Sequence, residues 1–307
     1  MAESVPPPGG REDGASAAAS ACPLCGSTRH RKDYDFSDSR APATVPGLVV
    51  SCRSCGLRFK IPARPEIPLA DYYADATVYR DRDDVAEAAK EFAQIIDVAA
   101  QLAAPGARLL DIGSGPGHFL GAAMRAGFRA TGVEINPELA RIAAQSSGAE
   151  VVVGDGTALR SVLAGRERSF DVVTLLDVVE HVSDPVALLR DAGAFVAPGG
   201  ALLVYTPNHS GLIARTAALT GRLSGGLVDG PLRGIYDCDH VVFFDPASLR
   251  DAVRRAGLRD GAMTMIRFNP DRRGIARGLS AHVLRALESL SPWIGGEFRM
   301  LLAAHID

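Results

Sequence analysis

Short apolar runs alternate with segments of helical spacing from residue 107 onwards. Continuous apolar runs such as 172–176 are typical of strands that are buried on both faces of a parallel sheet. The segments between these runs repeat apolar residues at helical intervals, which predicts amphipathic helices. The pattern therefore predicts an α/β fold in which helices cover both faces of a parallel sheet. The predicted strands are 107–112, 129–134, 150–153, 170–176 and 200–206, and the predicted helices are 117–126, 137–147 and 184–196.

Further elements are predicted before and after this core. Residues 84–103 have helical spacing, with Phe92, Ile95, Ile96 and Ala99 on one face, and Ala-Pro-Gly at 104–106 ends the helix. Residues 207–245 leave the alternating pattern, and no internal repeat is present. The remaining predicted elements are a helix at 246–256, a strand near 260–268, a helical segment near 274–291 and a strand near 298–305.

The first 61 residues have a different composition. Residues 1–20 are rich in Pro, Gly, Ser and Ala, so we expect a disordered tail. Two Cys-x-x-Cys-Gly sequences follow, with 26 residues between Cys25 and Cys52. Each can form a tight turn that directs two thiolates at one ion, and two such turns complete a tetrahedral structural zinc site. The predicted ligands are Cys22, Cys25, Cys52 and Cys55.

We therefore expect residues 21–61 to form a zinc ribbon that metal binding, rather than a core of its own, stabilises. A redox pair or unliganded cysteines are the alternatives, and Cys238 is expected to be a free thiol. Residues 62–83 are predicted to be a linker, stiffened by prolines. Within it, Tyr72, Tyr73 and Tyr79 are candidates either for a lid or for interdomain packing.

The segment 107–117 ends an apolar strand at Asp111 and then places glycines at alternate positions, Gly113, Gly115 and Gly117. Such a turn allows positive φ and brings backbone close to a ligand that lies over the end of the strand. A dinucleotide fingerprint would need glycine at position 118, where this chain has His118. Asp111 would repel an anion and attract an ammonium group, which favours a cationic nucleoside over a pyrophosphate.

In these residues the sequence resembles the class I S-adenosylmethionine-dependent methyltransferases. Asp-Ile-Gly-Ser-Gly-Pro-Gly at 111–117, Thr-Gly-Val-Glu-Ile-Asn-Pro at 131–137 and Gly-Asp-Gly at 154–156 match the first three family motifs in order. The resemblance implies a Rossmann-like methyltransferase domain at 84–307, with substrate-side insertions at 207–245 and 270–297. It also implies S-adenosylmethionine as cofactor, with Glu134 on the ribose and Asp155 on the adenine. The implied cofactor residues are Asp111, Gly113, Gly115, Gly117, Glu134, Asp155, Gly156 and Asp177.

Two histidines are candidates for a general base if the methyl acceptor is a hydroxyl, because the pKa of histidine suits proton removal. His181 follows the strand 170–176, and His240 lies in the variable segment beside Asp237 and Asp239. Packing or capping roles are the alternative for both. His118 and His209 are weaker candidates. Resemblance to the ubiquinone O-methyltransferase group implies that Asp177, Glu180 and His181 are candidate ligands for magnesium, which we do not favour, because the Glu-His pair is frequent in methyltransferases that have no metal.

Composition limits the partners. The chain of 307 residues carries 33 basic and 36 acidic side chains, so it lacks a general field for binding polyanions. We expect a cytoplasmic protein, because no apolar run is long enough to span a bilayer and no signal pattern is visible.

The predicted function is methylation of a small molecule, with O-methylation slightly ahead of N- or C-methylation. The alternatives are an RNA methyltransferase, for which Arg29–Lys32, Arg53, Arg58 and Lys60 would contact phosphates, a non-catalytic scaffold and hydride transfer. The oligomeric state stays open.

Overall fold

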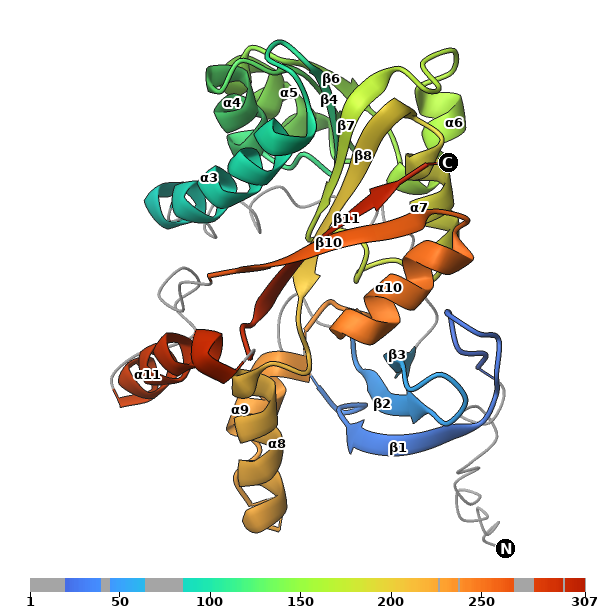
Figure 1. Ribbon diagram of the computed structural model, residues 1–307. Helices are drawn as coiled ribbons and strands as arrows, with labels where there is room; N and C mark the ends of the chain where they lie inside the picture. The colour runs from blue at the N-terminus through green and yellow to red at the C-terminus, as the bar shows by residue number, and fades with distance from the viewer. Residues whose placement is uncertain are drawn as a thin grey trace, which may run out of the picture.

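A seven-stranded sheet forms the centre of the larger part of the molecule in this computed structural model (Figure 1). The structure describes residues 20–39, 45–63, 85–225, 227–236, 238–267, 279–294 and 296–306. The sheet order is β10-β11-β8-β7-β4-β5-β6, in which β11 runs antiparallel to both of its neighbours and the pairs from β8 to β6 are parallel. The strands are β4 (Arg108–Ile112), β5 (Arg129–Glu134), β6 (Glu150–Val153), β7 (Phe170–Leu176), β8 (Val196–Pro207), β10 (Arg259–Ile266) and β11 (Arg299–His305).

Helices cover both faces of this sheet, as the sequence predicts (Figure 1). One face carries α3 (Val85–Leu102), α4 (His118–Arg125) and α5 (Pro137–Ser147), and the other carries α6 (Leu159–Val162), α7 (Pro185–Gly193) and α10 (Pro246–Arg255). The helix starts follow from the sequence, because Asn136, Asp184 and Asp245 each cap a helix whose first residue is proline. The mostly parallel α/β architecture is thus confirmed.

One predicted boundary is wrong. The helix expected at 184–196 ends at Gly193, and the strand expected at 200–206 already begins at Val196. The reason is a bulge in β8, because Phe170 pairs with Val196 whereas Val172 pairs with Ala201. Gly199, at φ 79°, lies in the extra residues of this bulge. Periodicity could not reveal the early strand start, because the bulge interrupts the alternation of side chains.

The cysteine-containing segment forms a second, four-stranded antiparallel sheet (Figure 1). Its own strands are β1 (His30–Asp35), β2 (Gly47–Cys52) and β3 (Arg58–Pro62). The fourth strand is β9 (Val242–Phe243), which comes from the segment that the sequence assigned to the substrate side. The small cysteine-containing part and the larger α/β part therefore share backbone hydrogen bonds as well as a contact surface.

The apolar core is likewise shared. Leu57, Phe59 and Ile61 of the ribbon belong to the same buried cluster as Leu249 and Val253 of α10. The opposite side of the ribbon packs with α8 (Leu212–Leu223) and α9 (Gly230–Tyr236), which project beyond the end of the large sheet together with α11 (Leu279–Ile294) (Figure 1). The ribbon thus has no separate core, in keeping with the small number of apolar residues in its sequence.

Some expectations fall outside the described residues. They are the tail at 1–19, most of the linker with Tyr72, Tyr73 and Tyr79, the side chain of Asp237, and the part of the C-terminal insertion at 270–278. Among the helices that the structure does describe, none is both long and apolar enough to cross a membrane.

Candidate active site

A cavity of about 250 Å³ opens where the carboxyl ends of β4, β5, β6 and β7 meet. This edge is where open parallel α/β sheets bind their ligands. Seven of the eight predicted cofactor residues line the cavity: Asp111, Gly113, Gly115, Glu134, Asp155, Gly156 and Asp177. His181, Asp239 and His240 line it as well, so the two groups of predicted site residues share one space.

The glycine-rich turn keeps side chains out of the cavity. Gly113 has φ 79°, and a Cβ atom there would lie 2.6 Å from Cγ2 of Val178. Gly117 is the one predicted cofactor residue that does not line the cavity. It has φ 85° and packs on α5, where a Cβ would lie 2.7 Å from the Cα of Ala143. Gly113 thus allows Val178 to pack closely against the turn, and Gly117 allows the close approach of α4 and α5.

Asp111 is buried at the end of β4, with 2% of its surface exposed. The parallel register places it beside Thr174 of β7, whose hydroxyl donates a hydrogen bond of 2.7 Å to Oδ1 of Asp111. Burial raises the pKa of Asp111 to about 7, since desolvation outweighs this hydrogen bond and the charge of Glu134 adds to the desolvation. A carboxylate held this way gains most from a cation placed next to it.

Glu134 ends β5 and is also buried. Its two carboxylate oxygens accept hydrogen bonds from the backbone N–H of Gly115, at 2.8 Å, and of Asn136, at 2.9 Å. Burial raises the pKa of Glu134, although these N–H donors oppose the rise. The side chain is thereby fixed against the glycine-rich turn, and each oxygen keeps a lone pair for a further donor.

Asp155 and Gly156 follow β6. The Asp155 carboxylate accepts a hydrogen bond of 2.7 Å from the N–H of Thr157 and so caps the short helix η1 (Gly156–Ala158). A Cβ at Gly156 would lie 3.3 Å from Cγ2 of Ile112, which leaves little room for a side chain. Both residues lie at the cavity edge farthest along the sheet from Asp177.

Asp177 makes an ion pair that the sequence did not predict. It has a positive φ of 55°, and its Oδ1 accepts a hydrogen bond from Nη1 of Arg299, which is 1% exposed. The Arg299 guanidinium also stacks over the ring of Tyr205 at 5.1 Å, and Tyr205 in turn donates to Glu91 at 2.6 Å. A lone arginine at the start of an apolar strand was the available signal, but its partner lies 122 residues away.

His181 and His240 come together at the same end of the cavity as Asp177. Their ring centroids are 4.7 Å apart, and the rings are nearly perpendicular. Asp239 approaches both, with 3.7 Å from its Oδ2 to Nδ1 of His181 and 4.0 Å from its Oδ1 to Nε2 of His240. Segments that are distant in sequence thus combine both candidate bases with one buried carboxylate.

Glu180 is fully buried beside this pair and accepts a hydrogen bond of 2.9 Å from Thr206. Burial, with the charge of Asp177 second, raises the pKa of Glu180 well above its usual range. The magnesium set implied by resemblance does not fit this arrangement. Asp177 is held by Arg299, and the donors that gather are those of Glu180, His181 and His240, in which two imidazoles replace the oxygen ligands that magnesium prefers.

The remaining two histidines differ from each other. His118 begins α4 and lines the cavity. His209 is buried, and its ring lies 6.1 Å from that of His240 and 4.9 Å from that of Phe243. Burial lowers the pKa of His209 to about 3, and the charges of Arg58 and Arg299 lower it further. His209 is therefore neutral and packs behind His240.

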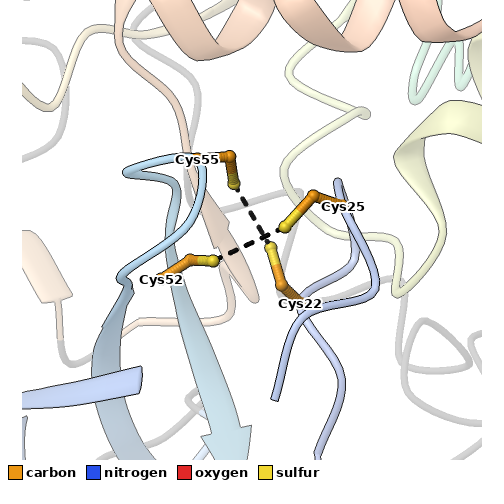
Figure 2. Close-up of side chains that lie close together, drawn as sticks. All are labelled: Cys22, Cys25, Cys52 and Cys55. Carbon is orange, nitrogen blue, oxygen red and sulfur yellow. Dashed lines mark hydrogen bonds between the residues drawn. The ribbon is translucent and has the colours of Figure 1, made fainter. Parts of the chain in front are cut away.

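The four predicted zinc ligands converge, as Figure 2 shows. Sγ of Cys22 lies 3.6 Å from Sγ of Cys55, and Sγ of Cys25 lies 3.5 Å from Sγ of Cys52. Zinc–sulfur bonds of about 2.3 Å place tetrahedral sulfurs slightly under 4 Å apart, so the cluster fits a zinc ion. Each pair sits on a turn closed by a glycine N–H, Gly26 to the carbonyl of Cys22 and Gly56 to that of Cys52.

Two of the basic residues considered for phosphate binding point into the protein. Lys60 is 3% exposed, and its ammonium donates to the carbonyl of Cys238 at 2.7 Å. Arg58 donates to Asp33 at 3.0 Å and to the hydroxyl of Tyr236 at 2.6 Å. These two side chains form hydrogen bonds between the ribbon and the segment before His240, and they do not contribute to an outward basic surface.

The sheet order, the glycine-rich turn and the acids at successive strand ends define the class I fold of S-adenosylmethionine-dependent methyltransferases. Residues 85–261 match the family described as "Methyltransferase domain", and the chain belongs to this family.

Curated relatives agree with this class. The ubiquinone biosynthesis O-methyltransferase of Xanthomonas campestris pv. campestris (strain B100) is 37% identical over 115 residues, 37% of this chain and 48% of that protein. The protein of the same name from Ralstonia nicotianae (strain ATCC BAA-1114 / GMI1000) is 30% identical over 167 residues, 54% of this chain and 68% of that protein. The chain spans about half the length of the first of these relatives.

Solved structures share the fold. A chain from the complex between the Haloferax volcanii Trm112 methyltransferase activator and a methyltransferase has a TM-score of 0.53 at 17% identity, covering 78% of this chain and 98% of that chain. Magnesium protoporphyrin IX methyltransferase from Synechocystis PCC 6803 gives 0.51 at 16% identity, with the same coverage. At such identities the likeness establishes the fold alone.

Proposed function

We propose that this protein transfers the methyl group of S-adenosylmethionine to a hydroxyl of a small-molecule acceptor. The observation that carries the proposal is the single cavity that joins the strand-end acids to the cluster of His181, Asp239 and His240. One end offers carboxylates to a cationic nucleoside, and the other offers proton-accepting groups to an acceptor. Methyl transfer needs both at one place, since it is a direct displacement between two bound molecules.

The proposed orientation of the cofactor follows from the positions of the three acids. The buried carboxylate of Asp111 would face the ammonium group, whose positive charge offsets the cost of ionising this residue in a desolvated site. Glu134, fixed by two backbone donors, would accept from the ribose hydroxyls. Asp155 would accept from the adenine amine. The sulfonium would then lie between these groups and the histidines.

At the acceptor end, the carbon–sulfur bond breaks as the carbon–oxygen bond forms, and the hydroxyl proton must leave. An imidazole of His181 or His240 would take this proton, oriented by Asp239. Alignment of the two reactants alone is worth about 7–11 kcal/mol, provided that water is excluded. The burial of Glu180, His209 and Tyr236 behind the cluster supports such exclusion.

A small acceptor is favoured over RNA because Lys60 and Arg58 turn inward. The names of the curated relatives, ubiquinone biosynthesis O-methyltransferases, also support small-molecule O-methylation. We further propose that a structural zinc ion binds the four cysteines and that the ribbon it organises shapes the acceptor side through β9.

The test begins with calorimetric titration of the zinc-loaded chain with S-adenosylmethionine and S-adenosylhomocysteine. Asp111→Asn and Glu134→Gln should each weaken binding, whereas the exposed-site control His282→Ala should not. Phenols, catechols and other hydroxylated molecules are then compared as acceptors by the release of S-adenosylhomocysteine. Failure of the wild-type chain to bind either nucleoside would refute the proposal, and salt-sensitive methylation of RNA in place of small molecules would refute its acceptor class.

A further inference from the structure

The acceptor end of the cavity contains a buried carboxylate that accepts no hydrogen bond from the protein. Asp239 lines the cavity with only 9% of its surface exposed. Its ion-pair partners are the imidazoles of His181 and His240, at 3.7 Å and 4.0 Å, and both distances exceed the length of a hydrogen bond. Within the part of the chain that the structure describes, the Asp239 side chain accepts no hydrogen bond. A buried carboxylate without a donor is costly and calls for a specific explanation.

The balance of charge in the cavity gives independent support. Of the residues that the structure describes, no lysine or arginine lines the cavity, whereas five acids do: Asp111, Glu134, Asp155, Asp177 and Asp239. The first three are assigned to the cofactor. Asp177 is compensated by Arg299, which is 1% exposed and lies behind the cavity wall. Asp239 is therefore the acid of this cavity whose negative charge still needs a cation.

The basic side chains of the neighbouring ribbon strand do not supply this cation. Lys60 donates to the backbone carbonyl of Cys238, the residue before Asp239, and its side chain does not line the cavity. Arg58 is engaged by Asp33 and by the hydroxyl of Tyr236. A positive charge beside Asp239 must therefore come from a molecule that enters the cavity.

We propose that Asp239 binds a protonated amine of the acceptor, so that the substrates are amino alcohols or aminoalkyl phenols. The inference rests on the proposed function for the methyl transfer, and on burial and charge for the amine site. Asp239 lies so close to both imidazoles that the ammonium and the reacting hydroxyl are near neighbours on the acceptor. The ammonium keeps its protons, whereas the hydroxyl proton passes to an imidazole as the carbon–oxygen bond forms and the carbon–sulfur bond breaks. Acceptors that carry a carboxylate in this position are repelled.

The experiment uses the full zinc-loaded chain and three probes that share a phenolic hydroxyl and differ in the group beside it. At neutral pH, ortho-hydroxybenzylamine is cationic, ortho-hydroxybenzyl alcohol is neutral and salicylate is anionic. Calorimetric titration, with and without S-adenosylhomocysteine, should show that the amine binds at least about 10-fold more tightly than the alcohol, because a hydrogen bond between charged groups contributes this much. Salicylate should bind most weakly. Equal affinities for the amine and the alcohol, no binding of the amine, or tighter binding of salicylate overturns the proposal without reference to any variant.

Variants then assign the preference to one carboxylate. Asp239→Asn should weaken binding of the amine, leave binding of the alcohol unchanged and so abolish the preference between them. Asp97→Asn is the matched control, because it makes the same chemical change on the exposed surface of α3. It should retain the full preference for the amine. A preference that persists in Asp239→Asn overturns the assignment.

Two further readouts separate this inference from the proposed function. Asp239→Asn should leave the affinities for S-adenosylmethionine and S-adenosylhomocysteine unchanged, and a selective loss of the first would assign Asp239 to the sulfonium and overturn the amine site. The methylated amine should carry its new methyl group on oxygen, and a methyl group on nitrogen overturns the inference. A wild-type chain that binds the nucleosides without preferring the amine refutes the inference alone. One that prefers the amine but binds neither nucleoside refutes the proposed function and leaves the amine site standing.

Discussion

The hydrogen bond from Thr174 to Asp111 should control the pH dependence of cofactor binding. Thr174 is completely buried, and its hydroxyl is the side-chain donor that lowers the pKa of Asp111. The substitution Thr174→Val keeps the shape of the side chain and removes this donor. A hydrogen bond to a charged group contributes about 1.5–3 kcal/mol, which corresponds to a rise of about 1–2 in the pKa of Asp111.

Asp111 has a pKa of about 7 in the wild-type protein, so about half of the molecules carry the carboxylate at neutral pH. In the variant this fraction falls to roughly 1–10%, and affinity for the cofactor ammonium should fall about 5-fold to 50-fold at pH 7. The difference between the two proteins should shrink as the pH rises, because the carboxylate forms in both at high pH.

Calorimetric titration with S-adenosylmethionine at several pH values measures this difference. Both proteins are compared at each pH, so titration of the cofactor's own amino group cancels in the ratio. Thr206→Val is the matched control, since Thr206 is also a buried hydroxyl that donates to a buried carboxylate, but at Glu180. Equal affinity of Thr174→Val and wild type at pH 7, or a ratio that does not change with pH, would refute the reasoning.

Further predictions concern stability and the ribbon. The pKa of Asp111 is higher in the folded protein than in the unfolded chain. Its contribution to the free energy of unfolding is therefore present below about pH 4, and about 4 kcal/mol is lost as the pH rises through about 7. Urea unfolding of Asp111→Asn should show a smaller loss over the same pH range. Arg299→Met should lower the free energy of unfolding by about 3–5 kcal/mol, because it leaves Asp177 without its buried partner. Lys60→Met should raise KM for the acceptor more than the Kd of the cofactor, as judged by initial rates and calorimetry, because its ammonium holds the carbonyl of Cys238. Removal of zinc by a chelator should lower the melting temperature in calorimetry, because zinc contributes on the order of 10 kcal/mol to the stability of small modules. It should abolish acceptor methylation while cofactor binding still persists.

The sequence was informative wherever a local pattern determined the structure. The limits of β5, α5, β6 and β7 match the predicted ranges, because buried parallel strands read as apolar runs and proline after a capping residue starts a helix. The same local signals located Asp111, Glu134 and Asp155 at strand ends, and the cavity brings these residues together.

Features that depend on distant partners were not predictable in this way. β9 has only two residues and becomes a strand because β3 lies beside it. Likewise, nothing near Asp177 in the sequence indicates Arg299, and the pairing of His181 with His240 joins two segments that are distant in the sequence. Thr174 is the one polar residue of the run 172–176, but its role depends on the register between β7 and β4.

The pairing of β3 with β9 has a consequence for engineering the enzyme. A chain cut to begin at α3 would lose the strand that pairs with Val242 and Phe243, and would remove Leu57 and Phe59 from the buried cluster that they share with α10. Such a truncation would yield an incomplete enzyme with an exposed apolar surface, and not a minimal catalytic domain. Chimaeras between homologues should therefore exchange the ribbon and the segment 207–245 together, since β3 of the ribbon pairs with β9 of that segment.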